Sequence, residues 1–369
     1  MKDIKMPSLR IGNMLIEKPI IQGGMGVGVS LSGLAAAVAN EGGVGVIASV
    51  GMAWINPGIK KDPGKAGRIA LISEIREARK RTNGILGLNI MVALSDYNEL
   101  LETAFDEDID IVFLGAGLPL KFPASISPDR LKKGHTKVAV IVSSARAADL
   151  IFRQWRKSFQ HIPDMVVVEG PLAGGHLGFK KEQIDHPDYT LEKILPEVIK
   201  TVAPYQAEFR RNIPVIAAGG IFTGKDIYKF LEMGAQGVQM GTRFVATHEC
   251  DASAAFKNAY IHCRKNDISI IKSPVGLPGR AIINAFLKKV ASGEKKPVHC
   301  PWQCLKSCNF KISPYCIAQA LINAQKGFLE RGFTFAGANA YRIKKIVPVR
   351  DLFITLNNEY KKAVLSAAV

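Results

Sequence analysis

A lone histidine stands among small residues in the stretch VVVEGPLAGGHLGF, Val166 to Phe179. The β-branched run at its start indicates a strand, and the glycines that follow indicate a turn that a ligand or another backbone approaches closely. An imidazole titrates near neutral pH, so His176 could take up a proton or stabilise a bound anion. His176 is therefore the candidate catalytic residue. A structural histidine bonded within the turn is the alternative.

Two later glycine-containing stretches, AAGGIFTG and MGTRF, each follow an apolar run. Gly219 and Gly220 precede a helix expected to begin near Lys225, and Gly241 and Thr242 follow the next run. Free backbone N–H groups and a helix N-terminus together bind anions. We therefore expect a phosphate cradle here, with tight turns that bind nothing as the alternative.

The stretch QGGMGVG, Gln22 to Gly28, offers a further surface without bulky side chains. A flat ring could contact the backbone of Gly23, Gly24 and Met25. Asn89 follows another apolar run, and its amide can both donate and accept hydrogen bonds. Asn89 is therefore either a ligand contact or the cap of the following helix.

A four-cysteine segment, CPWQCLKSCNFKISPYC, contains Cys300, Cys304, Cys308 and Cys316. In a reducing compartment such a group suggests zinc or an iron–sulfur centre before disulfides. The spacing matches neither a zinc ribbon nor a ferredoxin run. Alternatively, the first three cysteines share one face of a helix with Pro301 in its first turn, and all four are unliganded thiols.

Short apolar runs alternate with helical patterns along most of the chain. They are almost continuously apolar, as strands buried on both faces should be. We expect strands at Pro19–Gln22, Gly45–Ala48, Ile85–Asn89, Asp110–Leu114, Lys137–Val142, Met165–Val168, Pro214–Ala217 and Gly237–Met240. Eight such units predict a (β/α)8 TIM barrel over residues 1–245, with its chemistry at the carboxyl ends of the strands.

Residues 246–369 are expected to form a helical C-terminal subdomain that folds over the barrel mouth. Helical periodicity covers Ala252–Arg264, Ile282–Val290, Ile317–Leu329 and Val349–Leu365. No strand pair is expected in this part.

Composition and charge restrict the partners. The chain has 369 residues, 47% hydrophobic content and a formal net charge of +17. Its cations are scattered doublets such as Lys60-Lys61, without a basic run that contains aromatics, which argues against nucleic acid. A diffuse positive field suits anionic small molecules, phosphates or an acidic carrier protein. With no stretch typical of a signal peptide or membrane span, we expect a cytoplasmic protein that does not bind membranes.

Four motifs occur together in one order: PIIQGGMG, EGPLAGGHLG, IPVIAAGGI and GVQMGTRFV. Over about residues 19–247 the chain thereby resembles the nitronate monooxygenase (2-nitropropane dioxygenase) family and the related FMN-dependent enoyl-acyl-carrier-protein reductases. The resemblance implies a TIM barrel with non-covalent FMN and His176 facing the flavin as a base or electrostatic partner. The implied flavin contacts are Gly24, Met25, Gly26, Asn89 and Gly175, with the phosphate at Gly219, Gly220, Gly241 and Thr242.

Two positions depart from the family pattern. Leu172 precedes Ala173 where relatives commonly have glutamate, and Ile141 stands where some relatives have lysine. Neither change touches the expected flavin cradle, but both leave the substrate open.

The leading hypothesis is therefore FMN-dependent oxidation of an alkyl nitronate by oxygen. An NAD(P)H-dependent enoyl-acyl-carrier-protein reductase, with an acidic acyl carrier protein as partner, is the alternative, and an NAD(P)H:quinone reductase is a variant of the same site. Two hypotheses belong to other classes of protein. One is a non-redox phosphate-binding barrel with Glu169 and His176 as its acid–base pair, and the other is a regulatory barrel whose basic surface binds a partner.

The oligomeric state stays open, with a homodimer as one option. The other histidines are expected to face solvent: His135, His161, His186, His248, His262 and His299.

Overall fold

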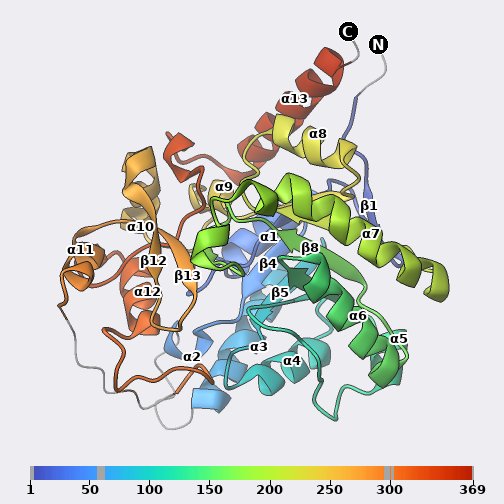
Figure 1. The fold of residues 1–369 in the computed structure, drawn as a ribbon, viewed down its shortest axis with the longest axis horizontal. Helices are drawn as coiled ribbons and strands as arrows, with labels where there is room; N and C mark the ends of the chain where they lie inside the picture. The colour runs from blue at the N-terminus through green and yellow to red at the C-terminus, as the bar shows by residue number, and fades with distance from the viewer. Residues whose placement is uncertain (1–3, 56–62, 295–299, 301–302, 368–369) are drawn as a thin grey trace.

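Eight parallel strands form the centre of the molecule (Figure 1). The computed structural model describes residues 4–55, 63–294, 300 and 303–367. The strands follow the order β3, β11, β10, β8, β7, β6, β5, β4, and a parallel bridge between Ile21 and Val44 brings the two edges together. Their bounds are β3 Ile20–Gln22, β4 Gly45–Ala48, β5 Leu86–Met91, β6 Ile111–Gly115, β7 Lys137–Val142, β8 Met165–Glu169, β10 Val215–Ala218 and β11 Gly237–Met240.

Helices alternate with these strands and cover the outside of the sheet. The α-helices are α1 Ser32–Asn40, α2 Met52–Ile55, α3 Pro63–Arg81, α4 Tyr97–Asp106, α5 Pro128–Lys133, α6 Ala145–Phe159, α7 Leu191–Phe209, α8 Gly224–Glu232 and α9 Thr242–Val245, with short 3-10 helices at Lys181–Gln183 and Pro187–Tyr189. The predicted (β/α)8 TIM barrel is thus confirmed, and each strand lies within two residues of its expected bounds. In the part of the chain that is described, no helix combines the length and the apolar character needed to cross a bilayer.

The barrel interior is filled by apolar side chains from its own strands and from an N-terminal hairpin. Strands β1 (Leu9–Ile11) and β2 (Met14–Ile16) pair antiparallel, and their inward side chains are buried together with Ile21, Phe113 and Ile216. The alternating exposure of this hairpin, buried then exposed then buried, is typical of strands with one buried face. The hairpin was not expected from the sequence.

The expectation that residues 246–369 contain no strand pair is wrong. Strands β12 (Ile268–Lys272) and β13 (Pro278–Ile282) form an antiparallel hairpin, and β13 also pairs with β9 (Gly175–His176) of the glycine loop. Such short strands are stabilised by pairing with a strand far away in the sequence, and a local sequence pattern does not reveal that pairing. Ile282, expected to start a helix, instead ends β13.

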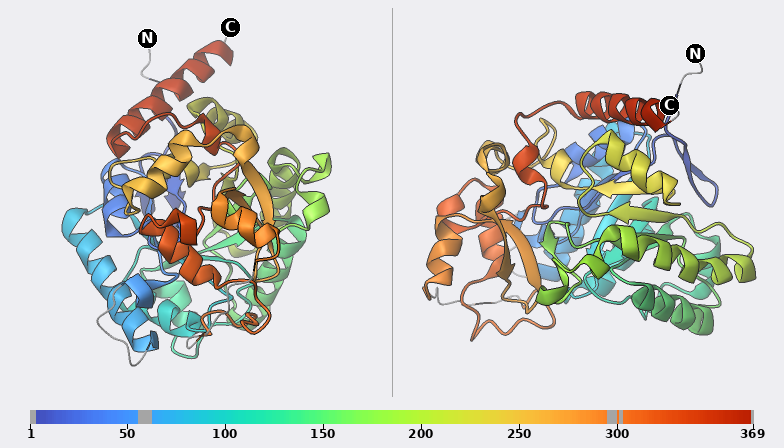
Figure 2. Two further views of the ribbon diagram at one scale, coloured as in Figure 1. Left: turned by 90° about the vertical axis from the view of Figure 1, so that its left-hand side faces the viewer. Right: turned by 45° about the horizontal axis from the view of Figure 1, so that its top comes forward.

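The helices of this C-terminal segment otherwise follow the prediction. They are α10 Ala254–His262, α11 Ala285–Ala291, α12 Ile317–Gln325 and α13 Val349–Ala367, with 3-10 turns at Lys265–Asp267, Leu329–Arg331 and Ala340–Arg342. Elements α10, β12, β13, α11 and α12 lie together at one end of the barrel, whereas α13 runs alongside α8 on the barrel's outer layer (Figures 1 and 2). The last helix therefore does not cover the mouth. The boundary at residue 245 stays a prediction.

Candidate active site

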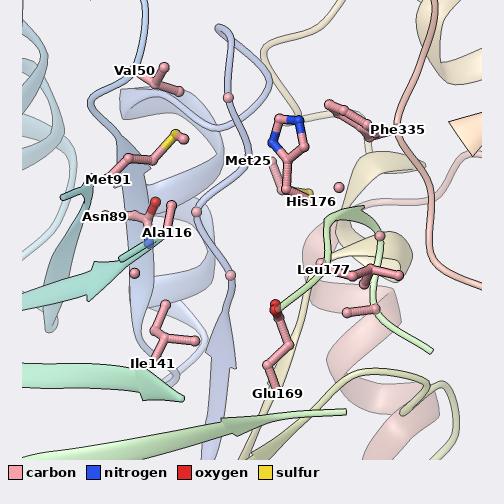
Figure 3. Close-up of a pocket in the computed structure, with 18 of the residues that line it drawn as sticks. Met25, Val50, Asn89, Met91, Ala116, Ile141, Glu169, His176, Leu177 and Phe335 are labelled. Carbon is pink, nitrogen blue, oxygen red and sulfur yellow. The ribbon is translucent and has the colours of Figure 1, made fainter. Parts of the chain in front are cut away.

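A cavity of about 1110 Å³ lies at the carboxyl ends of the barrel strands. The ten residues that the sequence assigned to catalysis or cofactor binding all line it: Gly24, Met25, Gly26, Asn89, Gly175, His176, Gly219, Gly220, Gly241 and Thr242. Residues of the C-terminal segment, among them Leu277 and Phe335, complete its wall. Figure 3 shows Asn89 and Met91 on one side of the cavity and His176 and Glu169 on the other. The fold thus brings residues from distant loops to one place.

The loops after β10 and β11 present unpaired backbone donors. Among the described residues, no protein acceptor is bonded to the N–H groups of Gly219, Gly220, Gly241 or Thr242. Residues near position 338 hold these loops, since Gly220 O accepts from Asn339 Nδ2 at 2.6 Å and Thr242 Oγ1 accepts from Gly337 N at 3.1 Å. The φ angles of Gly219 and Gly220, 91° and 87°, require glycine. Unpaired donors grouped in this way suit an anion such as phosphate.

The helix after these glycines does not contribute, contrary to expectation. Helix α8 begins at Gly224, and its end is closed by protein groups. Thr223 Oγ1 accepts from Asp226 N, and Glu359 of α13 accepts from Gly224 N at 2.7 Å. No described residue of α8 lines the cavity. An anion at this site would thus depend on the loop backbone alone.

The glycines after β3 are required by packing of the protein itself. A Cβ on Gly24 would lie 2.3 Å from Asn89 Cβ, and one on Gly26 would lie 1.9 Å from Val50 Cγ1. Asn89 is the fourth residue of β5, so it does not cap the next helix, whose N-cap is Asp96. That alternative is wrong. Within the described part of the chain, no hydrogen bond engages the Asn89 amide, which leaves it available to a ligand.

His176 lies in β9 and is held on two sides. Its Nε2 is 2.7 Å from Ser273 Oγ, and its ring meets the Phe335 ring at 5.0 Å between centroids. Burial lowers the pKa of His176 to about 4. The imidazole is therefore neutral at pH 7, which argues against a fixed positive charge at this position.

Glu169 is a cavity residue that the sequence suggested only for a non-redox acid–base pair. It ends β8, pairs in register with Ala218 of β10 and lines the cavity. Burial raises the pKa of its carboxyl group to about 7. Gln239, near the end of β11, also lines the cavity and was missed. In both cases a polar residue inside an apolar strand run was the available signal.

The two positions that depart from the family pattern both border the cavity. Ile141 lies in β7, and Leu172, 45% exposed, follows β8. Both side chains are aliphatic and uncharged. The cavity wall is consequently apolar at these two positions.

The four cysteines lie partly buried and carry no disulfide. Cys300, Cys304 and Cys308 do not share a helix, because the described residues before α12, 300 and 303–316, contain none. The shared helix face is therefore wrong, whereas unliganded thiols stay a prediction, and Pro301 itself lies outside the described residues. Burial, with the neighbouring cysteines adding to it, raises the pKa of Cys304 to about 12. Among described residues, no three His, Cys, Asp or Glu side chains form a metal-binding group. Metal binding stays a prediction that zinc and iron analysis of anaerobically purified protein would test.

The expectation for the other histidines was wrong for His161. His161 is 4% exposed, and burial lowers its pKa to about 4. His135, His186, His248 and His262 are exposed as expected, and His299 lies outside the described residues.

Comparisons with known proteins identify the family of this chain. A model of the family described as nitronate monooxygenase matches residues 8–359. A probable nitronate monooxygenase of Staphylococcus aureus strain Newman is 27% identical over 322 residues, which cover 77% of this chain and 81% of that protein. The structure of FabK from Thermotoga maritima superposes with a TM-score of 0.72 and 29% identity over 96% of both chains. A nitroalkane oxidase from Streptomyces ansochromogenes has a TM-score of 0.70 at 23% identity, over 95% of this chain and 98% of that one, and supports the fold alone.

Proposed function

The chain belongs to the nitronate monooxygenase family, and from this premise we propose that it binds FMN and oxidises an alkyl nitronate with oxygen. The family consists of flavin-dependent oxidoreductases, so two hypotheses from the sequence, a non-redox phosphate-binding barrel and a regulatory barrel, are excluded. The observation that carries the proposal is the set of N–H groups at Gly219, Gly220, Gly241 and Thr242, which have no acceptor in the described part of the protein and lie in the cavity that contains His176.

The cavity fits the groups of FMN. The unpaired N–H groups after β10 and β11 would hold the phosphate, and the backbone of Gly24, Met25 and Gly26 would contact the flat ring. Gly175 would face the same ring: its φ is 81°, and no atom lies within 4 Å of a Cβ placed on it. At about 1110 Å³ the cavity exceeds the usual range of about 300–1,000 Å³ for a ligand site, so a substrate would fit beside the cofactor.

When bound, the flavin would supply the redox chemistry between the substrate and oxygen. The protein's part is to bind and orient the substrate. His176 is neutral at pH 7 and offers a hydrogen bond to a substrate oxygen, while Ile141 and Leu172 provide an apolar wall for an alkyl group. The net charge of +17 attracts an anion such as a nitronate.

A second candidate is an NAD(P)H-dependent enoyl-acyl-carrier-protein reductase, for which an acidic carrier protein would be the partner. The likeness to FabK over 96% of both chains favours it. An NAD(P)H:quinone reductase would use the same cavity. A homodimer and a cytoplasmic location stay predictions for all three.

Anaerobic stopped-flow reduction of the flavin separates these functions. The purified yellow protein is mixed in turn with an alkyl nitronate, NADH and NADPH, and flavin absorbance is followed. Reduction by the nitronate, with little by either nicotinamide, is expected. Fast reduction by a nicotinamide and none by the nitronate would transfer the assignment to the reductases. A colourless protein that takes up no added FMN would overturn the flavin proposal itself.

A further inference from the structure

The β12–β13 hairpin of the C-terminal segment is built onto the histidine loop. Strand β13 pairs with β9, with Gly279 opposite His176 and Arg280 opposite Gly175. Leu177 N–H adds a bond to Pro278 O at 2.9 Å. The backbone of His176 is therefore fixed by an element about a hundred residues further along the chain, and the turn of this hairpin lies next to its side chain.

Ser273 occupies that turn and is 2% exposed. Its N–H donates to Leu277 O at 3.1 Å, and its carbonyl accepts from Gly276 N at 3.0 Å, so its backbone is held within the turn. Its hydroxyl lies 2.7 Å from His176 Nε2. Ser273 is consequently a buried, well-anchored partner for one ring nitrogen of the candidate catalytic residue.

The hydrogen bonds of the Ser273 hydroxyl indicate which atom carries the proton. Its oxygen already accepts from Val275 N–H at 3.4 Å. Among the described residues, His176 Nε2 is the one acceptor within reach of the hydroxyl proton. If Nε2 were protonated, it would donate to Ser273, and the serine proton would remain buried without a partner, which is costly. Donation from Ser273 to Nε2 satisfies both groups.

We propose that Ser273 is a positioning residue that holds His176 in the tautomer with its proton on Nδ1, so that an N–H is offered to the cavity. Figure 3 shows one ring nitrogen of His176 facing the side of the cavity where Asn89 and Met91 lie. This inference rests on the proposed function, in which His176 meets the substrate. It adds that His176 donates a hydrogen bond to an anionic substrate oxygen and does not remove a proton. The low pKa of His176 agrees with a neutral ring.

The tautomer can be measured directly by NMR on the holoenzyme. Protein labelled with ¹⁵N-histidine gives long-range ¹H–¹⁵N spectra in which a protonated and an unprotonated ring nitrogen resonate far apart. The His176 signals are assigned by their absence in His176→Asn. We expect Nδ1 to be protonated in the wild type, Ser273→Ala to move the proton wholly or partly to Nε2, and Ser273→Thr, which keeps the hydroxyl, to retain the wild-type pattern.

Ser269→Ala is the matched control, because Ser269 lies on the same hairpin but is exposed. The His176 ring ¹⁵N signals of the Ser269→Ala variant should be the same as those of the wild type. In the flavin reduction assay, Ser273→Ala should be slowed about five- to tenfold, as expected for one lost hydrogen bond, and Ser273→Thr should recover most of the rate.

A wild-type spectrum with the proton on Nε2, or an unchanged tautomer in Ser273→Ala, would overturn the inference. If Ser273→Ala does not fold, the wild-type spectrum alone still decides. The tautomer is read without any substrate, so failure of the nitronate assignment would appear only in the reduction assay.

Discussion

The buried guanidinium of Arg280 on β13 donates to the carbonyl oxygen of Ala173 at 2.8 Å and also to that of Pro171. Arg280 is 5% exposed, and burial lowers its pKa. A charged group from the C-terminal hairpin thus holds the loop that leads from β8 to His176. This relationship couples the order of the active-site loop to a segment outside the barrel.

Replacing Arg280 tests that coupling. Arg280→Met should lower the free energy of unfolding by about 1–3 kcal/mol, because two loop carbonyls lose their donor, and it should slow flavin reduction by loosening His176. Urea unfolding and stopped-flow reduction measure the two effects. Lys272→Met removes a positive charge from an exposed position of the same hairpin and should change neither. Equal behaviour of the two variants would contradict the role of Arg280.

The phosphate cradle is tested best at Gly241. A Cβ there would lie 3.4 Å from Met25 Sδ, an ordinary contact, and Gly241 does not have a positive φ. Gly241→Ala should therefore keep its flavin, whereas Gly241→Asp should be colourless, because its carboxylate would repel the phosphate. Flavin content is read from the absorbance of purified protein. Normal flavin in Gly241→Asp would remove the phosphate from this loop.

Gly24 should not tolerate even a methyl group. Gly24→Ala would place a Cβ 2.3 Å from Asn89 Cβ, so β3 and β5 would have to move apart at the cavity. We expect a loss of about 1–3 kcal/mol in the free energy of unfolding, together with reduced flavin content. Asn89→Gly, made in the Gly24→Ala background, removes the clashing atom and should restore part of the stability. An unchanged melting temperature in Gly24→Ala would show that the packing is looser than described.

His176→Asn separates a catalytic from a structural role. The variant should keep its flavin, because the proposed cofactor contacts are largely backbone. Flavin reduction by substrate should slow about five- to tenfold, as expected for one lost hydrogen bond. A loss of roughly 10²–10⁴-fold would instead indicate that His176 transfers a proton. Flavin occupancy, melting temperature and reduction rate are measured on one preparation. A normal rate with lowered stability would remove His176 from the mechanism.

Glu169 should make the stability of the apoprotein depend on pH. Its folded pKa of about 7 lies above the usual 4.5, so the folded state binds the proton more tightly, and the stability from this group is lost as pH rises from about 4.5 through 7. Glu169→Gln stays neutral at every pH. Its free energy of unfolding, compared with that of the wild type, should therefore be more favourable at pH 8.5 than at pH 5. The difference should be a few kcal/mol at most, given about 1.4 kcal/mol per pKa unit. Urea unfolding at both pH values measures this. The control Glu182→Gln, at an exposed position, should show no such gain. If the free energy of unfolding of Glu169→Gln changes with pH as that of the wild type does, the raised pKa of Glu169 is contradicted.

The sequence by itself determined the barrel and the position of its site. The apolar runs are local patterns, and strands buried on both faces have few alternatives to a parallel sheet covered by helices. Because loops at the carboxyl ends of barrel strands converge, the residues that follow those runs had to meet, and Gly24, Asn89, His176 and Gly241 do line one cavity. Gly24 and Gly241 were visible in the sequence as glycines that follow an apolar run.

Tertiary structure decided which side chains meet across long separations. Ser273 reaches His176 from 97 residues away, and Glu359 closes the helix at Gly224 from 135 residues away. The helix N-terminus that the sequence offered to phosphate is thereby occupied by a protein carboxylate. Likewise, Gly24 reads as a ligand contact in the sequence but is required by Asn89 in the fold. A local sequence pattern indicates secondary-structure propensity and burial. The hydrogen-bond partner of a buried polar group depends on how distant elements pack, and this packing is known only from the tertiary structure.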